Sequence, residues 1–171
     1  MSRIVPVPDR RQARTRAALL HSFTALMFEA RYDSFSVADI AARANVGRST
    51  FYEHFGSKDA LLGESMRPFL TVLADVAAGT GTGDRLRAVV EHIWDNRRLG
   101  RIVFAMPMRP VVERQLTDAI AARLGSEQRL AAVQIAAAQI AVMDAWTSGA
   151  VGATVDAIVA SLAGTRQLAS Q

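Results

Sequence analysis

Apolar residues recur at helical spacing in almost every segment of this 171-residue chain. Steps of three and four residues dominate, whereas the apolar–polar alternation typical of a half-buried strand is rare. Half of the residues are apolar, so the chain can bury a sizeable core and does not have the composition of a disordered protein. The pattern predicts an all-α fold.

Proline and glycine divide the chain into segments. We expect an extended arm over residues 1–8 and a head over 9–56, followed by a C-terminal helical bundle over 57–171, with a glycine-rich linker at 79–83. On the buried stripe of the first helix we expect Leu20, Phe23 and Met27. Helices are predicted at about 9–30, 37–44, 48–55, 58–78, 84–98, 99–106, 108–124, 127–148 and 152–165.

The positive charge lies in the first third of the chain. Residues 1–58 hold nine basic and five acidic side chains, which accounts for the whole net charge of +4, and the remaining residues are balanced at eleven of each. Such an asymmetry favours a head that faces a polyanion, although a solvated basic face without a partner has the same composition.

A tight turn separates two short helices within the head. Ser36 fits an N-cap, and Asp39 stands where its carboxylate can reach back, as in a capping box. Asn45 stands at the sharp turn, where a left-handed backbone conformation is expected. A longer helix followed by two short ones joined in this way is a helix-turn-helix plan.

The helix after the turn has two chemically different faces. At about 100° per residue, Phe51 and Phe55 face the core. The opposite half is polar and could contact base edges in a major groove, but an ordinary amphipathic helix has the same periodicity. The residues on this outward side are Ser49, Thr50, Glu53 and His54, with Tyr52 at the flank and Arg48 in the first turn.

Residues 36–62 strongly resemble the TetR (tetracycline repressor) family of bacterial transcriptional regulators. The core of the resemblance is Thr50-Phe51-Tyr52-Glu53-His54-Phe55-Gly56-Ser57-Lys58, and the match covers roughly residues 10–62. The family implies an all-helical homodimer with an N-terminal three-helix DNA-binding head and a C-terminal bundle that dimerises and often encloses an inducer pocket. In this sequence Asn45 replaces the usual turn glycine, and Gly47 replaces the usual Ser or Thr cap.

By motif position, the resemblance also implies contacts with double-stranded DNA. Tyr52 and Lys58 would contact phosphates, Ser36 would approach one, and the start of the recognition helix would read bases. Together with the outward residues, the expected DNA-binding set is Ser36, Arg48, Ser49, Thr50, Tyr52, His54 and Lys58. Glu53 could accept a hydrogen bond from a cytosine amino group or repel wrong sequences.

The segment 127–148 has apolar or small residues around most of its circumference, so it must be covered on more than one side. The second cover could be another subunit, and we expect a homodimer through residues 127–165. A monomeric core is the alternative.

Aromatic and methionine side chains follow the linker and could line a pocket for a small apolar effector, although ordinary core packing explains each of them as well. These candidates are His92, Trp94, Phe104, Met106, Met108 and Leu116.

The sequence offers little for other functions. It has no cysteine, its three histidines are far apart, and no metal-ligand, nucleophile-elbow or phosphate-loop motif is found, so neither catalysis nor a cofactor is expected. The apolar segment from Leu130 to Trp146 is interrupted by polar residues and falls short of the ~20 residues that span a bilayer. We therefore expect a cytoplasmic DNA-binding regulator, most simply a repressor, and as the alternative an architectural or adaptor DNA-binding protein without an inducer.

Overall fold

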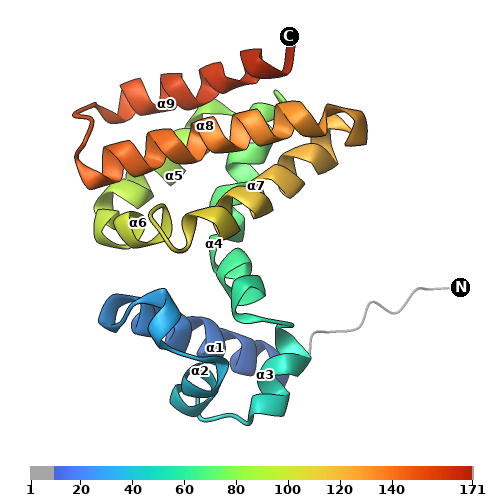
Figure 1. Ribbon diagram of the computed structural model, residues 1–171, viewed down its shortest axis with the longest axis vertical. Coiled ribbons are helices and arrows are strands. Elements are labelled where there is room, and N and C mark those ends of the chain that lie inside the picture. Colours follow the sequence, from blue (N-terminus) through green and yellow to red (C-terminus); the bar gives the residue numbers. More distant parts are fainter. Residues whose placement is uncertain (1–9, 171) are drawn as a thin grey trace, which may run out of the picture. The chain divides into compact units, whose positions relative to one another are not determined.

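The computed structural model describes residues 10–170, and all of its regular elements are helices (Figure 1). The predicted arm at 1–8 lies outside the described residues. The chain divides into two compact units between Leu61 and Leu62, within the helix α4 (Lys58–Ala77). Each unit is described separately below.

The first unit is a head built on α1, which runs from Arg10 to Glu29. A short 3₁₀ turn, η1 (Tyr32–Ser34), leads to α2 (Val37–Arg43) and α3 (Arg48–His54). The buried stripe of α1 contains Phe23 and Met27 as expected, but Leu19 takes the place predicted for Leu20. Leu19 precedes Phe23 by four residues and Leu20 precedes it by three, so both lie near the buried stripe, and Leu20 is only partly buried.

Local chemistry fixes where the short helices of the head begin and end. Ser36 caps α2, because its hydroxyl accepts from the amide of Asp39 while the Asp39 carboxylate accepts from the amide of Ser36. After α2 the chain turns at Asn45, whose φ of 55° is left-handed. Gly47 is the N-cap of α3 and supplies no side-chain bond. These details confirm the predicted capping box and turn.

The second unit is a helical bundle. It contains the rest of α4 and is completed by α5 (Gly83–Asp95), α6 (Arg97–Val103), α7 (Arg109–Leu124), η2 (Ser126–Gln128), α8 (Arg129–Ser148), α9 (Val155–Gly164) and η3 (Thr165–Ser170). Helix α8 is its central element and packs against α6, α7 and α9 (Figure 1). Ile135, Ile140 and Trp146 of α8 are buried in its core.

The region Ser126–Ser148 is long and apolar enough to cross a membrane by length and composition alone. The expectation of too short a segment concerned Leu130 to Trp146 alone, whereas the helical region extends further at both ends and remains apolar on average despite its polar residues. Its packing is nevertheless that of a core helix. Gln139 is completely buried and donates to the Thr165 hydroxyl at 3.0 Å, which compensates part of the cost of burying its amide.

Candidate functional site

The outer surface of α3 is polar, and its inner surface is aromatic. Phe51 and Phe55 are buried, and Tyr52 is half exposed, with its ring edge-on to that of Phe51 at a centroid distance of 5.5 Å. Arg48 and Ser49 are exposed at the first turn of the helix. Arg48, Ser49 and Tyr52 thus lie on one accessible face of α3, as is required of a helix that contacts base edges in the major groove of DNA.

Thr50 and His54 are only partly exposed, because they face the start of α1. They line a polar cleft of about 530 Å³, which also contains Glu53. The other residues of this cleft are Arg11, Gln12, Thr15, Asn45, Val46 and Gly47. Glu53 therefore lies in a cleft shared with Arg11, and the contribution of α1 to this surface was missing from the sequence-based set.

Ser36 is exposed, but its hydroxyl already lies 2.7 Å from the Asp39 carboxylate and caps α2. Hydrogen bonds from the Ser36 side chain and backbone hold the pKa of Asp39 below its ordinary value. The carboxylate is therefore ionised at neutral pH, and the capping box positions Ser36.

Lys58 differs most from the sequence-based expectation. Its ammonium donates to the carbonyl oxygens of Tyr32 at 2.5 Å and Phe35 at 2.7 Å. The same nitrogen lies over both aromatic rings, 4.2 Å and 4.7 Å from their centroids. Burial lowers the pKa of Lys58. Two of the three ammonium donors are thus used inside the head, so Lys58 joins α4 to the segment before α2.

Tyr32 strengthens the same junction. Its hydroxyl donates to the Asp59 carboxylate at 2.6 Å, and its ring packs edge-on against Phe23 and Phe35. Burial, followed by the bond to Asp59, raises the pKa of Tyr32 far above its usual value, so the hydroxyl stays protonated. We call Tyr32, Phe35, Lys58 and Asp59 the α4 junction.

Comparison with known proteins agrees with this geometry. Residues 15–64, which contain most of α1, the turn, α3 and the α4 junction, match the family model described as bacterial regulatory proteins of the tetR family. This head is that of a TetR-family regulator. The family resemblance seen in the sequence is therefore confirmed, and the matched residues are those of the DNA-binding head.

Relatives of this chain include two bacterial regulators. An uncharacterised HTH-type transcriptional regulator of Bacillus subtilis is 40% identical over 55 residues, which are 32% of this chain and 14% of that protein. An HTH-type transcriptional repressor of Mycobacterium tuberculosis is 32% identical over 103 residues, which are 57% of this chain and 52% of the relative. The chain thus spans about half or less of the length of these curated relatives.

The fold likeness extends beyond the head. A TetR transcriptional regulator from Streptococcus agalactiae superposes with a TM-score of 0.60 over 91% of this chain and 95% of that one, at 22% identity. At this identity the likeness concerns the fold. It confirms the expected all-α architecture of a helix-turn-helix head and a helical bundle.

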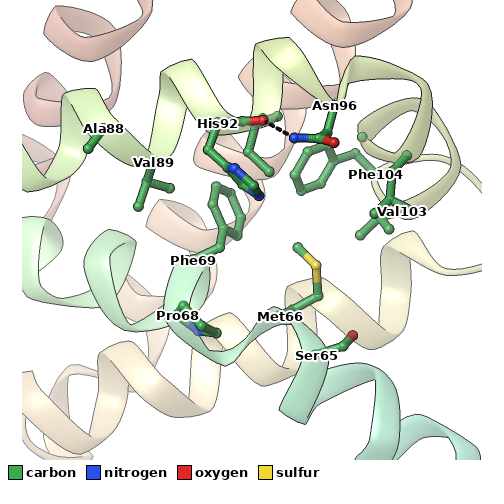
Figure 2. Close-up of a pocket in the computed structure, with 13 residues that line it drawn as sticks. Ser65, Met66, Pro68, Phe69, Ala88, Val89, His92, Asn96, Val103 and Phe104 are labelled. Carbon is green, nitrogen blue, oxygen red and sulfur yellow. Dashed lines mark hydrogen bonds between the residues drawn. The ribbon is translucent and has the colours of Figure 1, made fainter. Parts of the chain in front are cut away.

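The second unit of the chain contains a cavity of about 370 Å³ between α4, α5 and α6. In Figure 2, Met66 and Phe69 of α4 and His92 of α5 converge on it, with Phe104 just beyond the end of α6. The residues that line the cavity are Ser65, Met66, Pro68, Phe69, Ala88, Val89, His92, Ile93, Asn96, Leu99, Gly100, Val103 and Phe104.

Of the six predicted pocket residues, two line this cavity. His92 and Phe104 line the cavity, but Met108 and Leu116 are completely buried elsewhere in the core. Trp94 stacks on Trp146 at 4.5 Å, and Met106 is 71% exposed. The sequence-based set missed the contributions of α4 and the face of α5 that carries Val89, although the four-residue steps from position 88 to 92, 96 and 100 could have indicated that face.

Among residues 10–170, no group of three or more histidine, cysteine, aspartate or glutamate side chains is placed to hold a metal ion. The arrangement offers two places for binding: a polar helix surface on the head and an apolar cavity in the bundle.

Proposed function

We propose that this protein is a cytoplasmic, homodimeric transcriptional repressor that binds an inverted-repeat operator and is released by a small, largely apolar effector. The observation that carries the proposal is the accessible polar face of α3 on a TetR-family head. Arg48, Ser49, Thr50, Tyr52 and His54 would contact DNA from this face.

Ser36 and Lys58 would have a mainly structural role in DNA binding. Both are tied into the head by hydrogen bonds. The one ammonium donor of Lys58 beyond the two used on carbonyls would suffice for a phosphate, and Ser36 would approach a neighbouring phosphate. Their main contribution would be to hold α2 and α4 at the spacing that the backbone contacts need.

The dimer would form through α8 and α9, within residues 127–165. Leu130 is 74% exposed and Val133 46% exposed on α8, both large apolar side chains. Small residues, among them Ala141, Ala145 and Ala157, line an apolar groove of about 360 Å³ between α8 and α9, and they would let partner helices approach closely. A two-fold axis through this face would form a four-helix bundle and pair two heads.

The effector would occupy the cavity between α4, α5 and α6. Helix α4 supports this coupling, because it contains both Lys58 of the α4 junction and four lining residues of the cavity. Ligand binding would shift α4 at Pro68, which interrupts its backbone hydrogen bonds, and so change the spacing of the recognition helices.

Selection of bound sequences from random DNA tests the proposal. We expect an inverted repeat with half-sites one helical turn (~34 Å) or a multiple apart. Thr50→Ala should relax the preference at one position in each half-site, and Tyr52→Ala should weaken binding to all sequences alike. Enrichment of single, unrepeated sites would contradict the dimer, and no enrichment would contradict the regulator.

An architectural DNA-binding protein without an inducer is the second candidate, and the small volume of the cavity favours it. Thermal-shift measurements separate the two, because an effector that binds only the folded state raises the melting temperature. If no small molecule raises the melting temperature of the protein, the architectural role is favoured.

A further inference from the structure

We propose that the effector is an amphipathic organic anion, with its apolar body in the cavity and its anionic end in the adjoining groove beside Arg67 and Arg85. This inference rests on the proposed function, since it assigns a chemical class to the ligand of that cavity. Neither arginine belongs to the predicted pocket, and together they define a separate subsite at its edge.

The cavity itself suits an uncharged, apolar body. Its described lining contains no Asp, Glu, Lys or Arg side chain, and the side chains of Ser65 and Asn96 are engaged with the backbone. The Ser65 hydroxyl donates to the Leu62 carbonyl at 2.7 Å, and the Asn96 amide donates to the His92 carbonyl at 2.9 Å (Figure 2). A charged group inside this lining would lose its hydration without gaining a partner of opposite charge.

The adjoining groove supplies the opposite charge. It lies between α4 and α5 and shares Pro68, Ala88 and Val89 with the cavity, so that a ligand can extend from one into the other. Beyond these shared residues the groove is lined by Arg67, Thr71, Val72 and Arg85. The described lining of cavity and groove thus has two guanidinium groups and no carboxylate, which selects an anion.

Both guanidinium groups are largely exposed to solvent and lie where they can turn toward a ligand. The Arg67 side chain is 69% exposed and forms a pair with Glu64, three residues earlier. Arg85 is 63% exposed and lies 3.7 Å from Asp75, whereas Arg123 binds the same carboxylate at 2.7 Å. The Glu64 and Asp75 carboxylates are themselves only 17% and 20% exposed, and Asp75 keeps Arg123 as a partner when Arg85 moves.

The volume limits the length of the apolar body. At about 30 Å³ per water-sized group, 370 Å³ holds about a dozen non-hydrogen atoms, so octanoate, with roughly ten, is a suitable probe. A carboxylic acid is ionised at neutral pH, whereas octanamide has nearly the same shape without the charge.

The test is calorimetric titration of the full chain with octanoate, octanamide and octylamine. We expect octanoate to bind most tightly and octylamine most weakly. Arg67→Ala and Arg85→Ala should each weaken octanoate binding about five-fold and leave octanamide binding unchanged. High salt should weaken octanoate binding alone. The matched control is Arg101→Ala on α6, an exposed arginine outside both linings, which should change neither affinity.

Octanamide or octylamine binding as tightly as octanoate would overturn the anionic class, as would octanoate affinity that is indifferent to both arginines. Absence of octanoate binding would also overturn it. Failure of the proposed function is a separate result, because octanoate that binds in an arginine-dependent way but leaves the protein on selected operator DNA would refute release while supporting the ligand class.

Discussion

Lys58 lies at the centre of the α4 junction, where its ammonium contacts two carbonyl oxygens and two aromatic rings. Lys58→Met keeps most of the hydrocarbon stem but removes the charge. We expect the free energy of unfolding of the head to fall by about 2 kcal/mol, because hydrogen bonds to charged groups and cation–π contacts are both lost. Urea titration followed by circular dichroism measures this change.

The control for Lys58→Met is Arg48→Met, at an exposed position of α3. It removes a positive charge from the proposed DNA-binding face, so operator affinity should fall, while the unfolding free energy should stay within about 0.5 kcal/mol of the wild type. If Lys58→Met were as stable as Arg48→Met, the junction role of Lys58 would be wrong and only the phosphate contact would remain.

Tyr32 makes the head sensitive to alkaline pH. Its raised pKa means that the folded protein keeps the hydroxyl proton at pH values where the unfolded chain, with a pKa near 10.0, has lost it. The stability contributed by this proton is therefore complete below pH 10 and is lost as the pH rises further. The stability difference between wild type and Tyr32→Phe should shrink by about 1.4 kcal/mol per pH unit above 10. Urea midpoints at roughly pH 8 and 11 measure it, and a constant difference would contradict the assignment.

Residues whose roles depend on near neighbours could be predicted from the sequence. Ser36 and Asp39 are three residues apart, and Asn45 meets the backbone demand of its own turn, so local rules identified all three. The partners of Lys58 are 23 and 26 residues away, and no local pattern indicates them. The family motif placed Lys58 at the site but did not reveal that its ammonium faces inward.

At the scale of helices, α8 and α9 leave the apolar face that we propose as the dimer interface. Ala141 of α8 is exposed and lines the groove between the two helices. Ala141→Arg should convert the dimer to a monomer at micromolar concentration, because a charge would be buried without a partner at each of two symmetry-related positions. Light scattering after size exclusion measures the mass.

Ala122→Arg on α7 is the matched control, since Ala122 is exposed and lies outside that groove. It should leave the mass unchanged. A wild-type protein that is already monomeric at micromolar concentration, or an Ala141→Arg protein that remains dimeric, would exclude this face as the interface.

Helical periodicity predicted every α-helix of the described residues. It did not distinguish the residues that line the cavity from those that pack in the core. Met108 and Leu116 are as apolar as the residues of the cavity wall, and only their packing in three dimensions buries them elsewhere. Helix ends were also shifted: α9 begins at Val155, capped by Thr154, rather than at residue 152. Tertiary contacts and side-chain caps decide such details, and a single sequence reports them weakly.

At the scale of the whole molecule, the proposed coupling between effector and operator must be reciprocal. If the ligand lowers operator affinity by some factor, the operator lowers ligand affinity by the same factor. Helix α4 belongs to both units, and Pro68 lies within it. Since proline has no amide hydrogen, it cannot donate to the carbonyl four residues earlier, and α4 is easiest to deform there.

Pro68→Ala tests this coupling. The new amide can complete the backbone hydrogen bonds of α4, so the helix should be stiffer and the coupling factor should fall by about five-fold or more, with operator affinity in the absence of ligand nearly unchanged. Operator affinity measured with and without saturating octanoate gives the factor. Pro110→Ala is the control, because Pro110 occupies the first turn of α7, where an amide has no carbonyl to bind within the helix. An undiminished coupling factor in Pro68→Ala would mean that deformation of α4 at residue 68 does not connect effector binding to operator release.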